Sequence, residues 1–310
     1  RKINFSKNKA ILFLSLVFIF GLLGSLFVRF GLAKDIVSTQ SLEVSPPSQE
    51  IKIDPGQEII VRAKLRNKSF TPVNIKVRIE DFTATGQDGQ VALLEKELDS
   101  LKQWSLLSTE AFTLKSNEQK EVTALIKVPE GVAGGHYGSF VFSVVGDTPE
   151  AGTASLAQEV ASLFLMKVNG DVKEDLVLVD FKIAKFLEFG PVPMELKFKN
   201  SGNVHIKPFG LVNVRNIFGK TVKDVVVKGE TNIFPGATRI VRASMDKQFM
   251  FGLYTAEALM NYSKKNESLS SSVKFFVFPV RIFLVVLAVI FIIFKAKKRL
   301  IKAFRALAGK

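Results

Sequence analysis

The stretch EIIVRAKLRN, residues 58–67, sets the pattern that recurs through the middle of the chain. Apolar side chains alternate in it with mostly charged ones: Ile59, Val61, Ala63 and Leu65 against Ile60, Arg62, Lys64 and Arg66. Successive side chains of a strand point to opposite faces, so period-two alternation gives one buried face and one solvated face. Such a strand is typical of an antiparallel sheet.

The same alternation recurs in VNIKVRIE, residues 73–80, and in MELKFK, residues 194–199. Between the apolar runs stand turn dipeptides, which are Pro55-Gly56, Asp88-Gly89, Ser201-Gly202 and Pro235-Gly236. Many short strands separated by turns of this kind are typical of β-sandwiches. We therefore expect an all-β region built from Ig-like antiparallel β-sandwiches.

A weak internal repeat predicts two such sandwiches in tandem. Each half of the region carries an Asn-containing turn, RNKS at 66–69 and KNSGN at 199–203. Each half also ends in a Gly-x-Tyr strand, at Gly135-His136-Tyr137 and at Gly252-Leu253-Tyr254. The expected organisation is a signal peptide or signal anchor over 1–33, a first Ig-like β-sandwich over 34–170, a second over 171–274, a transmembrane helix over 275–295 and a basic cytoplasmic tail over 296–310.

The formal net charge of +14 comes from the two ends of the chain. No Asp or Glu precedes Lys34 or follows Lys274, so all 29 acidic residues lie between them, among a similar number of cations. A nucleic-acid-binding protein concentrates cations on a folded face, where they neutralise phosphates. Cations that flank apolar segments instead follow the positive-inside rule, so we expect no nucleic-acid partner.

The first apolar run, residues 10–28, follows basic residues and is succeeded by Gly31-Leu32-Ala33. This small-x-small triplet resembles a signal-peptidase site, with cleavage after Ala33. The run is also long enough for an uncleaved signal anchor, and both alternatives stay open. Either one directs residues 34–274 out of the cytoplasm.

The second apolar run, residues 275–294, is followed by a cluster of cations and predicts a stop-transfer helix. We therefore expect a plasma-membrane protein with a single C-terminal span, extracytoplasmic N-terminal domains, a cytoplasmic C-terminal tail and the lipid bilayer as a partner. The expected membrane-surface anchoring residues are Arg281, Lys295, Lys297, Lys298, Arg299, Lys302 and Arg305. Beyond the span, Leu300, Ile301, Phe304 and Leu307 share one helical face, which fits either a helix along the inner leaflet or a plain stop-transfer tail.

Catalytic and metal-binding patterns are weak in this sequence. It has no cysteine, and its two histidines, His136 and His205, lie in different predicted sandwiches without metal-ligand spacing. The Gly-rich EGVAGGHYG, residues 130–138, lacks the lysine of a phosphate loop and predicts a turn into a strand. We expect no enzyme, cofactor or metal.

Aromatic side chains could in principle form a binding platform. The candidates are Trp104, Tyr137, Phe140 and Phe142. In a β-sandwich such residues more often fill the core, and we expect that role for them.

Four local motifs resemble the bacterial WxL-interacting surface proteins. They are Pro55-Gly56 with RNKS, DFTATGQDGQV at 81–91, VPEGVAGGHYGSFVF at 128–142 and KNSGNVHIKPFGLVNVRNIFGK at 199–220. The resemblance covers roughly residues 40–295 and consists mostly of turn sequences and the strands beside them. It implies a membrane-tethered, non-enzymatic protein, with a wall-facing first domain and a membrane-proximal second domain that meets a partner.

The leading hypothesis is a membrane-anchored cell-surface binding or scaffold protein whose Ig-like domains bind cell-wall polymer or a partner envelope protein. The alternative is an accessory subunit of a larger membrane complex, such as a secretion, pilus or sensory assembly. A wall-modifying enzyme would need a pair of carboxylates at fixed separation, and the 29 acidic residues supply such pairs only by chance.

Overall fold

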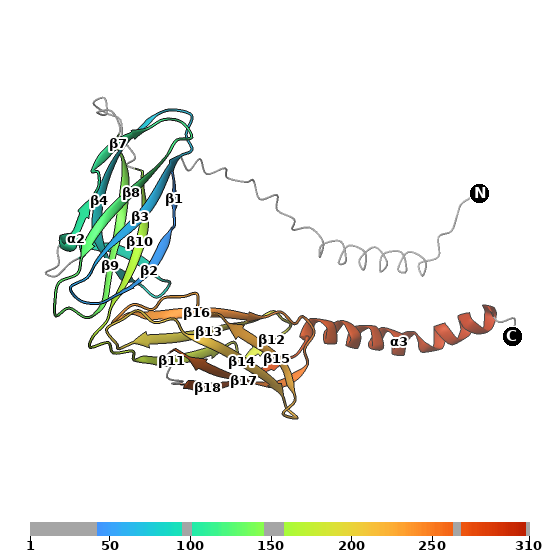
Figure 1. Ribbon diagram of the computed structural model, residues 1–310. Helices are drawn as coiled ribbons and strands as arrows, with labels where there is room; N and C mark the ends of the chain where they lie inside the picture. The colour runs from blue at the N-terminus through green and yellow to red at the C-terminus, as the bar shows by residue number, and fades with distance from the viewer. Residues whose placement is uncertain (1–41, 95–100, 146–157, 263–267, 308–310) are drawn as a thin grey trace, which may run out of the picture. The chain divides into compact units, whose positions relative to one another are not determined.

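The computed structural model describes residues 42–94, 101–145, 158–262 and 268–307 (Figure 1). These residues form two β-sandwiches and a C-terminal helix, and all of them fall into a single unit. The predicted signal segment over 1–33 lies outside the described residues.

The first sandwich packs two sheets face to face. One has the strand order β1-β3-β8-β6, and the other has the order β2-β10-β9-β4-β5, with β7 also paired to β4. Its elements are β1 (Leu42–Ser45), β2 (Ser48–Ile53), β3 (Glu58–Asn67), β4 (Val73–Thr85), β5 (Gln90–Leu94), α2 (Leu101–Trp104), β6 (Ser105–Leu107), β7 (Ala111–Leu114), β8 (Gln119–Lys127), β9 (Gly134–Val145) and β10 (Glu159–Val168).

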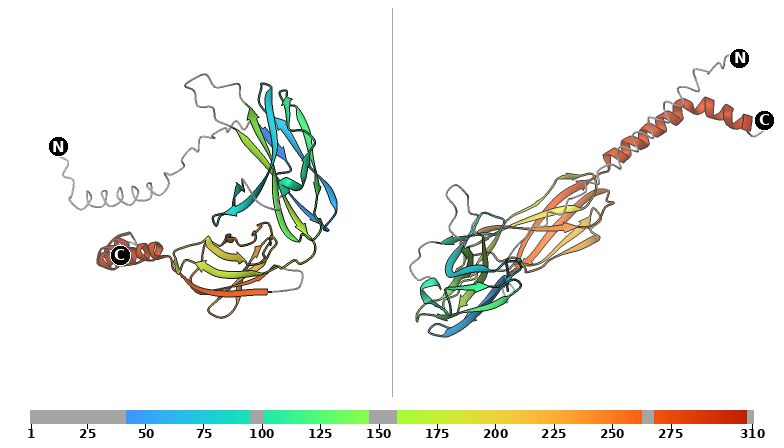
Figure 2. Two further views of the ribbon diagram at one scale, coloured as in Figure 1. Left: turned by 90° about the vertical axis from the view of Figure 1, so that its left-hand side faces the viewer. Right: turned by 90° about the horizontal axis from the view of Figure 1, so that it is seen from above.

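The second sandwich has sheets in the orders β11-β13-β16 and β12-β18-β17-β14-β15. Its strands are β11 (Leu176–Ile183), β12 (Phe186–Leu187), β13 (Val192–Asn200), β14 (Phe209–Asn216), β15 (Thr221–Val227), β16 (Thr238–Met245), β17 (Gly252–Asn261) and β18 (Ser268–Val277). The helix α3 (Val280–Leu307) leaves the second sandwich directly after β18 (Figures 1 and 2).

The two sandwiches share one topology. The order β2-β10-β9-β4-β5 corresponds strand for strand to β12-β18-β17-β14-β15, and β1-β3-β8 corresponds to β11-β13-β16. In both, the first two strands switch sheets, so that β2 lies parallel to β10 and β12 lies parallel to β18. The prediction of an all-β, Ig-like fold is thereby confirmed, and the sequence repeat reflects a repeat of topology.

The predicted alternation matches the burial of side chains. Val61, Ala63 and Leu65 on β3 are buried, as are Met194 and Phe198 on β13. One core is made of residues between positions 42 and 168, and the other of residues between positions 176 and 277. The two cores are separate, so each sandwich has its own hydrophobic interior.

A buried asparagine closes the same turn in both sandwiches. Asn200 accepts a hydrogen bond from the Gly202 N–H at 2.9 Å and donates to the carbonyls of Val204 and Ile233, both at 2.7 Å. Asn67 likewise accepts from the N–H two residues ahead and donates to carbonyls of its own turn and of β7. The turns RNKS and KNSGN are therefore structural equivalents.

The predicted boundary between the second sandwich and the membrane segment was wrong. Phe275 and Val277, placed by prediction in a helix over 275–295, are buried core residues of β18, and α3 begins only at Val280. The last strand and the helix are both apolar and adjoin, so hydropathy alone does not separate them. Pro279 marks the boundary, because proline lacks an N–H for a strand ladder but is tolerated at a helix start.

The helix also continues through most of the predicted basic tail over 296–310, as far as Leu307. Among the residues that the structure describes, no helix is both long enough and apolar enough to cross a membrane.

Candidate binding surfaces

Aromatic packing joins the two sandwiches. Phe82 on β4 and Leu165 on β10 form a small buried cluster with Phe234, which precedes β16. The ring of Tyr137 lies 4.7 Å from that of Phe234 in an edge-on arrangement, and the Phe82 ring lies 5.6 Å from the Phe234 ring. This third cluster is apolar, buried and shared by both sandwiches, which makes the junction a packed interface.

Backbone groups approach closely at the same junction. The Gly135 N–H donates to the Asn203 carbonyl at 2.8 Å. A Cβ added at Gly135 would lie 3.2 Å from Val204 Cα and within clashing distance of the Tyr137 hydroxyl. The glycines of EGVAGGHYG thus allow the second sandwich to contact β9, and the prediction of a turn into a strand is confirmed, since β9 starts at Gly134.

The two histidines both contact aromatic rings. His136 lies 4.7 Å from the Trp104 ring, and His205 lies 5.6 Å from the Tyr137 ring of the other sandwich. Burial lowers the pKa of His205 below its ordinary value, because the charged imidazolium is less well solvated there than in water. Both histidines are thus part of the packing.

The other aromatic residues singled out in the sequence also pack inward. Phe140 and Phe142 are fully buried in the first core, and Trp104 packs against that core. Tyr137 packs against the cluster at the junction, where burial raises the pKa of its hydroxyl. The prediction that these residues fill a core is confirmed for Phe140 and Phe142, whereas Trp104 and Tyr137 are only partly buried.

A shallow groove lies on the first sandwich. It has a volume of about 350 Å³ and is lined by Arg78, Glu80, Leu93, Leu94 and Lys102. The lining comes from β4, β5 and α2, which the strand pairing and a backbone contact bring together. That contact is a hydrogen bond of 3.1 Å from the Lys102 N–H to the Asp81 carboxylate, which holds α2 against β4.

Ion pairs hold the polar side of the groove in place. The Arg78 guanidinium pairs with Glu159 through two hydrogen bonds of 3.0 and 3.1 Å, and Lys102 Nζ lies 2.8 Å from the Glu80 carboxylate. The hydrogen bond from Arg78 is the main reason that the pKa of Glu159 is lowered. Leu93 supplies a half-exposed apolar wall beside these charges. The groove thus offers apolar contact and hydrogen bonding together.

Exposed apolar side chains gather at the end of the second sandwich from which α3 leaves. Phe218 is 89% exposed in the β14–β15 turn, and Phe249 is 80% exposed in the β16–β17 loop. We call this set the aromatic end, and its members are Phe186, Ile217, Phe218, Phe249, Phe251 and Phe276. Single exposed apolar side chains are normal on a soluble surface, whereas large exposed apolar patches mark interaction sites.

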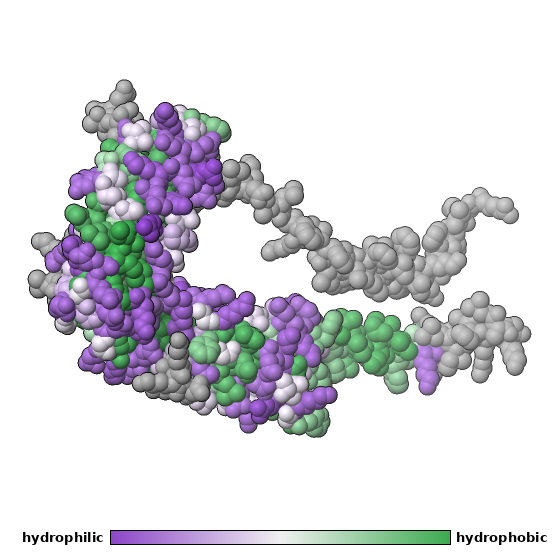
Figure 3. All heavy atoms as spheres, in the orientation of Figure 1, coloured by the Kyte–Doolittle hydropathy of each residue, from purple (hydrophilic) through white to green (hydrophobic). Residues whose placement is uncertain are grey.

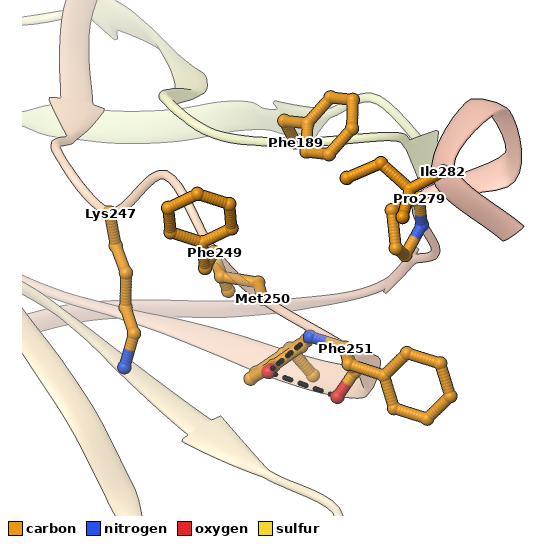
Figure 4. A pocket seen from close by; sticks show the side chains of 8 residues that line it. Phe189, Lys247, Phe249, Met250, Phe251, Pro279 and Ile282 are labelled. Atoms are coloured by element: carbon orange, nitrogen blue, oxygen red, sulfur yellow. Dashed lines mark hydrogen bonds between the residues drawn. The ribbon is translucent and has the colours of Figure 1, made fainter. Parts of the chain in front are cut away.

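A hollow of about 410 Å³ opens within this end (Figure 4). Phe189 and Ile282 line it from one side, and Phe249 and Met250 from the other. The Tyr254 hydroxyl accepts a hydrogen bond from the Phe251 N–H and donates one to the Phe251 carbonyl, both at 3.1 Å. The loop that carries the exposed phenylalanines is therefore fastened to the core strand β17.

The helix α3 exposes its apolar side chains between Ile282 and Phe294. Each large apolar residue from Ile282 to Phe294 is exposed, and Figure 3 shows the apolar surface of α3 beside the more polar second sandwich. These side chains have no cover within the described chain. A helix that is apolar all round is typically buried in protein or in lipid.

The predicted anchoring cations all lie on α3. Arg281 is in its first turn, where its guanidinium pairs with Glu188 at 3.2 Å, and Lys295 Nζ lies 5.7 Å from the Phe291 ring centre. Lys297 is exposed. The backbone of α3 includes the remaining predicted residues, which are Lys298, Arg299, Lys302 and Arg305.

The aromatic end was not predicted from the sequence. Its members come from separate turns, and only the strand register brings them to one end of the sandwich. The available signal was the presence of large apolar residues inside turn sequences, such as Phe218 in NIFGK.

Among the residues described, no group of three His, Cys, Asp or Glu side chains could hold a metal ion.

No family model and no curated protein matches the sequence. Among solved structures, the chain is similar to the class 5 fimbriae chaperone CfaA, at 12% identity and a TM-score of 0.40, over 74% of this chain and 98% of that one. It is similar to the Salmonella enterica SafA pilin–SafB chaperone complex at 13% identity and a TM-score of 0.34, over 75% and 96%. A PapD-like domain of human CEP192 matches 42% of this chain and 85% of its own, at 13% identity and a TM-score of 0.30. Identities and scores this low carry no inference about function.

Proposed function

We propose that this protein is held at a lipid bilayer by α3 and presents its two Ig-like sandwiches to a partner at the cell surface, either an envelope protein or a cell-wall polymer. The observation that carries the proposal is the exposed apolar surface of α3, which begins directly after the last strand of the second sandwich. The resemblance of the sequence motifs to the WxL-interacting surface proteins supports the same role.

Charge supports lipid as the cover of α3. The sequence of the helix contains no acidic residue, and its cations cluster after Phe294. Cations at the end of an apolar helix are attracted to anionic headgroups, by about 1 kcal/mol for each Lys or Arg near the surface. The apolar side chains between Ile282 and Phe294 then lie in the bilayer, and removing their surface from water favours binding.

We assign partner binding to the groove of the first sandwich. Its lining combines the apolar Leu93 with the charged Arg78 and Lys102, and such mixed linings supply both contact area and orientation. The groove lies on the sandwich that is farther along the chain from α3. This separation leaves it available when the helix is bound to lipid.

Flotation with vesicles tests the proposal. A chain of residues 42–310 is compared with a chain of residues 42–279, so that both lack the apolar run 10–28, using vesicles of phosphatidylglycerol and phosphatidylcholine. We expect the longer chain to float with the vesicles and the shorter chain to remain at the bottom. If the longer chain also remains at the bottom, α3 does not bind lipid and the proposal fails.

A second candidate function is a subunit of a larger membrane complex. It is favoured by the continuation of α3 to Leu307, beyond the continuous apolar run that ends at Phe294. Deleting residues 300–310 then reduces the size of the detergent-solubilised assembly in gel filtration. An unchanged size would exclude a role for this segment in assembly.

A further inference from the structure

The strand register brings separate segments to the end of the second sandwich where α3 begins. Gly252 at the start of β17 pairs with Val277 at the end of β18, and Asn216 at the end of β14 pairs with Tyr254. In the opposite sheet, the start of β13 pairs with the end of β16. The loops that follow or precede these residues therefore share one end.

Three of the segments at this end each carry an exposed phenylalanine side chain. Phe186 lies on the short strand β12, Phe218 between β14 and β15, and Phe249 between β16 and β17. The hydrogen bonds between Tyr254 and Phe251 fix the β16–β17 loop to the core. The backbone that carries Phe249 and Phe251 at the aromatic end is thus held in place by hydrogen bonds.

Within the aromatic end, the side chains of Phe249, Phe251 and Phe276 form an apolar surface that continues onto α3. The Phe278 ring lies 5.4 Å from the Phe251 ring and 5.3 Å from the Phe283 ring of α3. Ile282 of α3 lines the same hollow as Phe249. Whatever covers the start of α3 therefore also meets the sandwich.

Cations lie among these side chains. Exposed Lys185, Lys220 and Lys247 occupy the same loops. The acidic residues in these loops are Asp246 and Glu188. The Glu188 carboxylate is paired with the guanidinium of Arg281 on α3. Amphipathic helices that lie in the headgroup region of anionic membranes likewise combine phenylalanine with lysine.

We propose that the aromatic end is a second lipid-binding site, which inserts its phenylalanine side chains into the interface of the bilayer that holds α3. The inference rests on the proposed function, because the same bilayer must cover both surfaces. Its occupant is lipid, since the apolar surface around Phe249, Phe251 and Phe276 continues onto α3, the β14–β15 turn lies at the same end, and the cations complement anionic headgroups. The second sandwich then contacts the membrane directly, in addition to being attached to it through α3.

Site-specific labelling tests this proposal, because the chain has no cysteine of its own. Single cysteines are introduced in the full chain as Phe218→Cys, Phe249→Cys and Phe283→Cys, and each is labelled with a dye whose emission shifts to the blue in an apolar environment. Phe70→Cys is the matched control, because Phe70 is 95% exposed in the first sandwich. The proteins are bound to vesicles of phosphatidylglycerol and phosphatidylcholine, with and without nitroxide-labelled lipid.

We expect dyes at positions 218, 249 and 283 to shift to the blue and to be quenched by the nitroxide lipid, while the dye at position 70 does neither. A response at 283 alone would overturn the inference and leave the proposed function standing. No response at 283 would overturn both. Replacing phenylalanines that are 89% and 80% exposed leaves the core intact, and thermal unfolding of each labelled variant verifies this.

Discussion

At the scale of single residues, two buried asparagines define the repeat. Asn67 and Asn200 are each fully buried, and each supplies both donor and acceptor groups to the backbone of its turn. An unpaired buried polar group is costly, so the backbone groups of such a turn need these partners. The amide side chain is therefore required where a hydrophobic residue would otherwise be expected.

Replacing Asn200 by alanine should destabilise the second sandwich. The change removes the side-chain partners of the Gly202 N–H and of the carbonyls of Val204 and Ile233. We expect a loss of about 2–4 kcal/mol in the free energy of unfolding, measured by denaturant titration. Asn74→Ala is the control, because Asn74 is exposed and its side chain accepts a hydrogen bond from Thr113. Equal effects of the two changes would contradict the assignment.

Gly135→Ala should weaken the junction between the sandwiches. The new methyl group would crowd Val204 Cα at 3.2 Å and the Tyr137 hydroxyl. We expect a destabilisation of roughly 1–3 kcal/mol from this overpacking, seen as a lower melting temperature. Gly229→Ala provides a matched control, since its nearest contact would be 3.5 Å, an ordinary distance. A stable Gly135→Ala protein would show that the junction is not tightly packed.

Stability should fall as the pH is lowered through the range in which histidine titrates. Burial lowers the pKa of His205 in the folded state, and its Nδ1 atom has no hydrogen-bond partner among the described residues. The unfolded chain therefore binds the proton more tightly, and stability declines as the pH falls below the unfolded value of about 6.5. The free energy of unfolding between pH 8 and pH 5 should depend less on pH in His205→Gln. An identical slope in the variant would count against this.

At the scale of elements, the boundary between β18 and α3 shows what hydropathy does and does not resolve. The alternation of buried and exposed side chains identified β3, β4 and β13 from sequence, because each has one solvated face. Around residue 275 the chain is apolar on both sides of Pro279, so the strand and the helix merge into one apolar run. The pairing of β18 with β17 separates them, at the boundary that Pro279 marks.

Two truncations test this boundary. A fragment of residues 42–279 keeps Phe275 and Val277 in the second core, whereas a fragment of residues 42–274 loses both. Because large-to-small changes of buried residues cost about 2–5 kcal/mol each, the shorter fragment should unfold at a much lower denaturant concentration. Fragments of equal stability would place residues 275–277 outside the sandwich.

At the scale of the whole molecule, the tandem β-sandwich architecture could be predicted from the sequence, and the aromatic end could not. Turn residues and alternation report on local structure, and a repeated Asn turn reports on a repeated unit. The aromatic end depends on which strand termini meet, as when Asn216 pairs with Tyr254, and no local pattern contains that information. The same limit applies to the groove, whose lining comes from β4, β5 and α2.

The most direct test of the central claim is partner binding by the full chain held on vesicles. Binding to purified cell wall and to solubilised envelope proteins is measured at about 0.5 M salt, where contacts between exposed charges are largely screened. We predict saturable binding that Leu93→Glu in the groove abolishes and that Ile60→Glu, on an exposed position of β3, leaves unchanged. Binding that is absent, or equally strong in the two variants, would contradict the claim.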